Sequence, residues 1–242
     1  MSRKGSAALA LALVAAAGAG CGGGRDGGEA ATRVGTGEAG GGRPSPVTVV
    51  GSSVAVDPRH ITLSLRLEQP KGIDPPVAKT ATVTLRGNGI DYDGARQPAC
   101  DAATIRGGGV DACPEGSVVG TGEAVGMADT AETKAQITIV NGGRDGVLLS
   151  TLIRNPAYVK AIVPGRIAKR DGGLTIAFTF PPELQDVGGV PIGLRRLTLA
   201  LTRGGAVTAA RCDGWRYDAD VGFSDDTVGR HQGRVACRPA PR

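Results

Sequence analysis

From Val47 onward, the chain alternates apolar and polar residues with a period of two. Four segments show this most clearly, residues 61–67, 80–85, 174–180 and 197–202, where aliphatic or Phe side chains are separated mainly by Thr and Ser. Because successive side chains of a β-strand point to opposite faces, the pattern predicts strands with one buried and one solvent-facing side. A sustained helical period is absent after the first 20 residues, and only a short helical turn is expected, at 181–187.

Glycine-rich turns separate these expected strands. Asn141-Gly142-Gly143 and Asp171-Gly172-Gly173 each lie between two apolar segments, and Gly204-Gly205 follows the segment 197–202. Glycine adopts positive φ without a steric penalty, which suits the tight turns of antiparallel hairpins. The sequence therefore predicts a single all-β domain over residues 47–242, built as an antiparallel β-sandwich or meander.

The N-terminus has the pattern of an export signal. Arg3 and Lys4 precede an uncharged run of Ala, Leu, Val and Gly over residues 7–20, which ends at Cys21. As a helix this run would reach roughly 21 Å, short of the ~30 Å hydrocarbon layer. We therefore expect a signal peptide over residues 1–20 and lipidation of Cys21. The alternative is ordinary cleavage after Ala17 or Ala19, followed by free secretion.

Residues 21–46 are rich in Gly and contain no aromatic side chain. Such a segment buries too little apolar surface to offset its ordering entropy, so we expect a disordered tether. As a Gly-rich coil it would span roughly 25 to 30 Å. The expected location is thus extracytoplasmic, with the β domain held at the cell membrane by a lipid, or secreted if Cys21 is not lipidated.

Cysteine parity agrees with a lipid anchor. The chain has five cysteines, and an exported protein with an odd number leaves one without a disulfide partner. Lipidation of Cys21 would leave four, for which we expect two local disulfides, Cys100–Cys113 and Cys212–Cys237, although two other pairings are open. A cysteine-based metal or redox site is less favoured because no C-x-x-C spacing occurs and export leads to an oxidising compartment.

Cys113-Pro114-Glu115-Gly116-Ser117-Val118-Val119-Gly120 resembles the Cys-Pro-x-x-Ser-x-Val/Ile-Gly segment of a group of uncharacterised, secreted, β-rich proteins of high-GC actinobacteria. The later order of strands, a cysteine near Gly214-Trp215 and a last cysteine near the C-terminus is also similar, so the likeness covers roughly residues 80–240. The resemblance implies secretion and a β fold, and it implies no assigned activity. Members are often tandemly duplicated, whereas this chain has one copy.

Catalytic patterns are weak. The chain has only two histidines, His60 and His231, and no His-Glu-x-x-His or zinc-ribbon spacing. Residues 116–120 differ from a nucleophile elbow because Ser117 directly follows the first Gly. Residues 120–126 lack the dinucleotide fingerprint and fit a strand or bulge with close backbone packing. A hydrolase would need His231 with Asp225 or Asp226, so we predict no catalytic residue and no cofactor.

Two further features suggest binding. Two Asp-rich segments offer oxygen ligands for calcium: one contains Asn88, Asp91 and Asp93, and the other contains Asp218, Asp220, Asp225 and Asp226. Asn, Asp and Gly are also the ordinary residues of tight turns, so we predict no metal site. Trp215 and Tyr217 offer a carbohydrate-stacking surface, although a lone Trp beside a disulfide is more often core.

Composition limits the partners. Loss of Arg3 and Lys4 with the signal lowers the net charge from +5 to +3, and the chain has three Phe, three Tyr and one Trp. This does not match the basic face with stacking aromatics of a nucleic-acid module. We therefore expect a cell-envelope protein with a non-catalytic binding or structural role, whose partners are the membrane, through its anchor, and an envelope polymer or protein. The alternatives are an extracellular hydrolase that uses His231 and a β module that binds a small hydrophobic ligand or lipid.

Overall fold

The computed structural model describes residues 43–44, 48–57, 59–68, 76–87, 89–170, 172–203, 205–209 and 214–237. All of these belong to one compact unit, Gly41–Arg242. The expected signal peptide, Cys21 and most of the expected tether lie outside the described residues. Arg43 and Pro44, at the end of that tether, form a short strand that pairs in parallel with residues 227–228. No helix among the described residues is long and apolar enough to cross a membrane.

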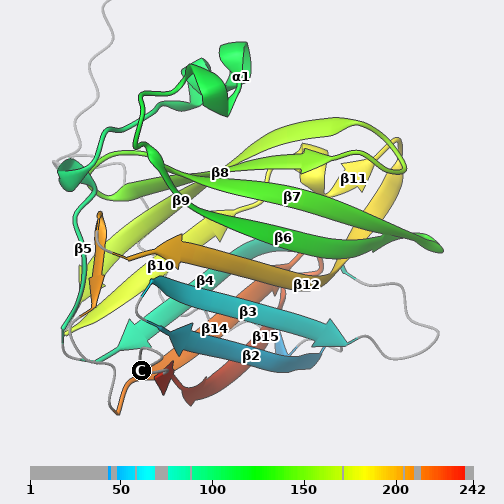
Figure 1. The fold of residues 1–242 in the computed structure, drawn as a ribbon. Helices are drawn as coiled ribbons and strands as arrows, with labels where there is room; N and C mark the ends of the chain where they lie inside the picture. Colours follow the sequence, from blue (N-terminus) through cyan, green and yellow to red (C-terminus); the bar gives the residue numbers. More distant parts are fainter. Residues whose placement is uncertain are drawn as a thin grey trace, which may run out of the picture. The chain divides into compact units, whose positions relative to one another are not determined.

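Strands dominate the domain (Figure 1). The elements are β1 (Arg43–Pro44), β2 (Thr48–Val56), β3 (His60–Glu68), β4 (Ala78–Arg86), β5 (Ile90–Tyr92), η1 (Gly94–Arg96), α1 (Ala102–Gly108), η2 (Val110–Ala112), β6 (Val118–Ala128), β7 (Ala131–Asn141), β8 (Gly146–Ile153), β9 (Val159–Arg170), β10 (Gly173–Thr179), η3 (Pro182–Leu184), β11 (Asp186–Val187), β12 (Val190–Thr202), β13 (Val207–Ala209), β14 (Arg216–Phe223), β15 (Thr227–Arg234) and β16 (Ala236–Cys237).

Among the described residues, fourteen strands form one sheet in the order β1-β15-β14-β4-β10-β9-β8-β7-β6-β12-β3-β2-β16, with β11 beside β12, and β5 and β13 form a separate pair. Neighbours are antiparallel except at the short strands β1 and β16. The sheet bends so that β6, β12, β3 and β2 face β10, β4, β14 and β15 (Figure 1). The expected all-β, antiparallel class is confirmed, as a single sheet that encloses its core in the manner of a sandwich.

The period of two explains the core. In β3, Ile61, Leu63, Leu65 and Leu67 are buried while the side chains between them are half-buried or exposed. The same alternation occurs in β8 and β10. The glycine turns also occur where expected: Gly143 and Gly172 have φ of 104° and 75° and lie between the antiparallel pairs β7–β8 and β9–β10. At 181–187 the structure has the short helix η3 followed by β11.

The segment between β5 and β6 carries the helix α1, which the alternation did not predict. The Asp101 carboxylate accepts a hydrogen bond from the Thr104 N–H and caps the helix, which holds the pKa of Asp101 below its usual value. Ile105 packs with Cys100 and Val140, so the segment is attached to the outer side of the sheet at β7. The expected Cys100–Cys113 disulfide is confirmed, with a Cα–Cα distance of 5.5 Å.

Of the two expected disulfides, the structure thus shows one within the described residues. Cys237 is disulfide-bonded, but Cys212, its expected partner, lies outside the described residues. The pairing Cys212–Cys237 therefore stays a prediction.

Buried Asn141 fastens the β5–β6 segment to the sheet. Its amide nitrogen donates to the carbonyl oxygens of Gly94, Gln97 and Pro98, at 2.8, 2.9 and 3.1 Å. Its amide oxygen accepts from the Gly143 N–H at 3.1 Å and from the Tyr92 hydroxyl at 3.0 Å. Burial of Tyr92 raises the pKa of its phenol to about 12, so this hydroxyl stays protonated and can donate. One fully satisfied amide therefore orients the whole loop.

Candidate functional site

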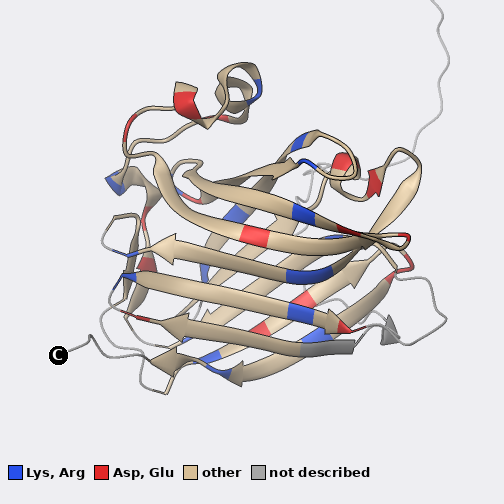
Figure 2. Cartoon of the chain, turned by 45° about the vertical axis from the view of Figure 1, so that its right-hand side comes forward, with Lys and Arg blue, Asp and Glu red and all other residues tan. Residues whose placement is uncertain are grey.

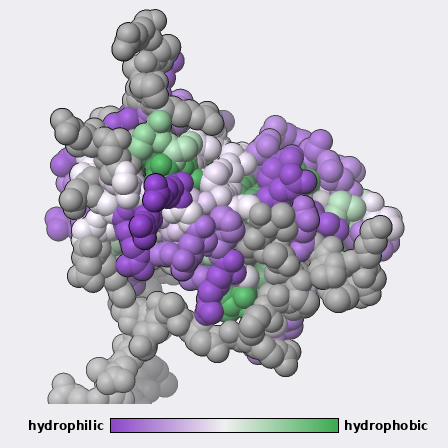
Figure 3. Space-filling view, turned by 90° about the horizontal axis from the view of Figure 1, so that it is seen from below, coloured by the Kyte–Doolittle hydropathy of each residue, from purple (hydrophilic) through white to green (hydrophobic). Residues whose placement is uncertain are grey.

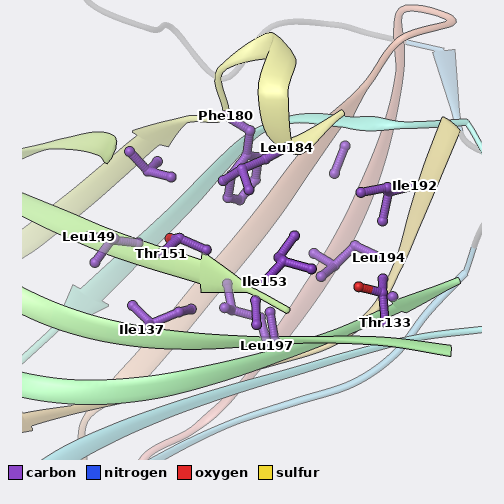
Figure 4. A pocket seen from close by; sticks show the side chains of 15 residues that line it. Thr133, Ile137, Leu149, Thr151, Ile153, Phe180, Leu184, Ile192, Leu194 and Leu197 are labelled. Atoms are coloured by element: carbon purple, nitrogen blue, oxygen red, sulfur yellow. The ribbon is translucent and has the colours of Figure 1, made fainter. Parts of the chain in front are cut away.

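An apolar pocket lies between the two facing parts of the sheet, near the end where β8, β12 and the β6–β7 hairpin meet (Figure 4). It is lined by aliphatic side chains, one Phe, two Thr and one Gly: Ala78, Ala124, Gly126, Thr133, Ala135, Ile137, Leu149, Thr151, Ile153, Val163, Phe180, Leu184, Ile192, Leu194 and Leu197. Both Thr133 and Thr151 are almost fully buried. Within the described part of the chain, the lining contains no ionisable side chain, which suits an uncharged apolar ligand.

Small residues on β6 and β7 create this space. Ala124 and Gly126 alternate along β6 with the exposed Glu123 and with Val125, and Ala124 lies opposite Ala135 of β7. A Cβ atom added to Gly126 would lie 2.8 Å from Cγ2 of Ile192, so this position has room only for hydrogen. The gap therefore lies beside the short side chains of Ala124 and Ala135, since Ile192 already packs against Gly126.

The register of the strands shows how the pocket is layered. Ala135 lies opposite Ile153 of β8, and two residues further along the strands Ile137 lies opposite Thr151. Thr133 lies two residues before Ala135, near the start of β7, and its hydroxyl donates to the Asn155 carbonyl at 2.8 Å. With a rise of about 3.4 Å per residue, Thr151 thus lies roughly 14 Å from Thr133 along the strands.

Residues 180–187, here called the cover, lie over the pocket. They contribute Phe180 and Leu184 to the lining (Figure 4). Gln185 holds the cover together: its side-chain amide donates to the Phe180 carbonyl at 2.6 Å, and its own carbonyl accepts from the Ile192 N–H at 2.9 Å. The cover consists of the short helix η3 and the two-residue strand β11, which pairs with β12.

The pocket volume is about 70 Å³. Cavities that enclose a whole drug-sized ligand measure roughly 300–1,000 Å³, and one of about 150 Å³ holds benzene. The pocket in this structure therefore has room for a few carbon atoms. A straight alkyl chain end fits these dimensions, whereas a fused ring system does not.

His231 lies at a second candidate site, where β15 comes next to β2. Its Nδ1 is 2.7 Å from the Ser52 hydroxyl, and the Tyr217 hydroxyl donates to the Ser52 carbonyl. Tyr217 and His231 also stack, with ring centroids 6.2 Å apart. A Cβ on Gly233 would lie 2.5 Å from the Tyr217 hydroxyl oxygen, so Tyr217 reaches β2 only because residue 233 is Gly. These contacts join the two ends of the curled sheet.

The carboxylates that a hydrolase would need beside His231 lie elsewhere. His231 pairs with Ala219 in the middle of the β14–β15 ladder, whereas Asp225 and Asp226 form the turn that joins these strands. Asp225 accepts hydrogen bonds from the Thr227 hydroxyl at 2.6 Å and from its N–H at 3.1 Å. No carboxylate is hydrogen-bonded to His231 within the described part of the chain, so the orienting member of a catalytic triad is not in place.

The Asp-rich segments are engaged in ion pairs. Asp91 contacts Lys169 and Arg96, and the hydrogen bond from Lys169 holds the pKa of Asp91 below its usual value. Asp220 contacts Arg230 at 3.5 Å, but burial raises the pKa of Asp220. Asp218 lies 2.8 Å from the Arg86 guanidinium, and Asn88 is outside the described residues. No group of three or more His, Cys, Asp or Glu suitable for a metal occurs in the described part of the chain.

Trp215 and Tyr217 are core residues, with exposed fractions of 2% and 3%. The Trp215 ring lies over Gly87, where a Cβ atom would be 2.1 Å from Cδ1. Neither ring is open to solvent, so the structure offers no carbohydrate-stacking surface at these two residues.

The exterior is mixed in charge. Basic and acidic residues are scattered over the strands in Figure 2, and the described residues on the face seen in Figure 3 are mostly hydrophilic, with small apolar patches between them. Among the described residues, the large apolar side chains that are exposed are Val118, Tyr158 and Val190. Such scattered residues are normal for a soluble surface and mark no extended docking face.

The pocket was not predicted from the sequence. Its signal was nevertheless present, because residues 120–128 place Gly or Ala at every second position. That pattern predicts a strand whose inner face is almost without side chains, and the structure confirms the strand as β6. The residues opposite β6 could not be identified, since they come from distant parts of the chain.

No protein-family model matches this chain, and no curated protein or solved structure matches it.

Proposed function

We propose that this chain is an exported, non-catalytic binding protein of the cell envelope, whose β domain holds the end of an alkyl chain in the apolar pocket. The observation that carries the proposal is an apolar pocket of about 70 Å³ whose lining, among the described residues, includes no charged side chain. The N-terminal pattern supports the location: Arg3 and Lys4, an apolar run and Cys21 are typical of a lipoprotein signal. Lipidation of Cys21 would keep the domain at the membrane, where alkyl chains are abundant.

The test is calorimetric titration of the purified full chain with the carboxylates from butanoate to decanoate. Each buried methylene contributes about 0.8 kcal/mol, so affinity should rise about fourfold per carbon until the pocket is filled. Two variants on neighbouring positions of β7 provide the comparison. Ala135→Leu places three added carbon atoms in the pocket, while Gln136→Leu adds a Leu on the exposed face.

We expect Ala135→Leu to remove binding of every carboxylate and Gln136→Leu to bind like the unmodified protein. Equal binding by both variants would mean that the chains bind elsewhere. Affinity that does not change with chain length would also contradict the proposal.

The anchor has a separate test. Cys21→Ala should move the protein from the membrane fraction of expressing cells into the medium. Unchanged membrane partition would contradict lipidation of Cys21 but would leave the pocket proposal intact.

The Ser52–His231 contact supports a second candidate, an extracellular hydrolase. The 2.7 Å contact from the Ser52 hydroxyl to Nδ1 is the geometry in which an imidazole can accept a serine proton. Hydrolysis of short-chain aryl esters that is lost in both Ser52→Ala and His231→Ala would establish this activity. Equal rates in the variants and the unmodified protein would exclude this pair as its source.

A further inference from the structure

Thr151 is an unusual residue on the pocket wall. Its side chain lies on the inner face of β8 between Leu149 and Ile153, and it is only 5% exposed. It lies opposite Ile137 on β7 and Ala161 on β9, neither of which has a polar side chain. Within the described part of the protein, its hydroxyl has no hydrogen-bond partner.

Thr133, the other hydroxyl of the lining, is different because it donates to the Asn155 carbonyl at 2.8 Å. Within the described residues, the fully buried side-chain atoms without a hydrogen-bond partner are Ser117 Oγ and Arg195 Nε, so the Thr151 hydroxyl, on the pocket wall, keeps some accessible surface. Val would have the same shape without a polar atom at this position. Every other inward position of β8 is indeed apolar: Val147, Leu149 and Ile153. The hydroxyl at residue 151 therefore has no structural purpose that the surrounding residues explain.

We propose that Thr151 is a specificity residue, which selects an alkyl chain that carries a carbonyl or hydroxyl oxygen in its inserted segment over a plain hydrocarbon chain. The Thr151 hydroxyl donates a hydrogen bond to that oxygen. This inference rests on the proposed function, since it assigns the chemical class of the chain that the same pocket holds.

For a ligand chain that enters from the strand ends near Thr133, the position of Thr151 along the strands defines where the oxygen of the ligand must be. Thr151 lies one layer further in than the layer of Ala135 and Ile153, and Leu149 and Val163 lie beyond it. The oxygen is therefore near the inserted end of the chain, followed by only a short apolar terminus that contacts Leu149. A polar group at the outer end of the ligand would not reach Thr151.

The experiment compares octanoate with its 5-oxo, 6-oxo and 7-oxo derivatives by calorimetric titration of the full chain. All four probes have the same length and the same carboxylate, so they differ only in the carbonyl oxygen. Thr151→Val removes the hydroxyl and keeps the shape, and Thr151→Ser keeps the hydroxyl. Thr138→Val, on the outer face of β7, is the matched control.

We expect the unmodified protein to bind one of the oxo derivatives about tenfold more tightly than octanoate, as for one additional hydrogen bond at the upper end of the usual net strength. Thr151→Val should reverse this preference, while Thr151→Ser and Thr138→Val should retain it. Preference for octanoate over all three oxo derivatives in the unmodified protein would overturn the role of Thr151 and leave alkyl binding intact. Absence of binding by all four probes would overturn the proposed function as well.

A second measurement needs no ligand. Because the Thr151 hydroxyl has no partner in the described structure, Thr151→Val should be at least as stable as the unmodified protein in urea unfolding. Thr133→Val should be less stable, because it loses the bond to Asn155. A destabilised Thr151→Val variant would show that the hydroxyl serves the fold and would contradict a role in ligand selection.

Discussion

Replacement of Asn141 by Leu should be among the most destabilising single changes in the domain. Leu has a similar size but can neither donate nor accept hydrogen bonds. The change removes the donor to the Gln97 and Pro98 carbonyls and the acceptor for the Gly143 N–H. Each backbone group left without a hydrogen-bond partner costs roughly 1–3 kcal/mol, but water can bond to some of these groups at the edge of the loop. The free energy of unfolding should therefore fall by about 3–5 kcal/mol.

Urea unfolding of the full chain measures this loss as a shift of the midpoint at constant slope. Thr138→Val, three residues earlier on the outer face of β7, is the control and should change the stability by less than about 1 kcal/mol. Proteolysis should also cut the Asn141→Leu variant within residues 93–117, because this segment loses its attachment to the sheet. A loss below about 1 kcal/mol would refute the conclusion that this amide orients the loop.

Four other changes have definite expected results. Removal of the Cys100–Cys113 bond in the double variant Cys100→Ala, Cys113→Ala should lower stability by about 3 kcal/mol, measured as the urea midpoint, because the bond closes a short loop across 13 positions. Tyr217→Phe should lower it by about 1–3 kcal/mol, since the Ser52 carbonyl loses its donor. Asp91 and Asp220 should have opposite pH dependence in unfolding measured from pH 2 to 7. Because the pKa of Asp91 is lower in the folded state, its carboxylate stabilises the fold above pH 3.8, and this contribution is lost as the pH falls through the folded-state pKa. Asp91→Asn should therefore lower the free energy of unfolding only above pH 3.8. Because the pKa of Asp220 is higher in the folded state, its contribution to stability is full below pH 3.8 and is lost as the pH rises through the folded-state pKa. Asp220→Asn should therefore raise the free energy of unfolding at neutral pH.

Local patterns in the sequence predicted the strands well, because alternation within one strand needs no knowledge of its neighbours. The segment 61–67 is buried at every second residue as expected, and the turn at Asn141-Gly142-Gly143 joins the expected pair of strands. The short-range disulfide Cys100–Cys113 was predictable for the same reason. Helix α1 was not, since seven residues are too few for a helical period to be recognised.

The candidate sites depend on contacts between distant residues, which a single sequence does not contain. Ser52 and His231 are 179 residues apart, and only the curvature of the whole sheet brings them together. His231 and Asp225 are close in sequence, yet the extended β15 separates them along its length. Thr151 has no special sequence environment, and its significance follows only from its apolar neighbours on β7 and β9.

The central claim is that the pocket behind the cover holds an alkyl chain. A crystal structure of the full chain grown with decanoate tests it most directly, because it locates the ligand. The account predicts electron density for the chain end against Leu149 and Ile137, beneath Leu184 of the cover. Density for decanoate only on the outer surface, or an unchanged and empty pocket at a saturating concentration, would contradict the account.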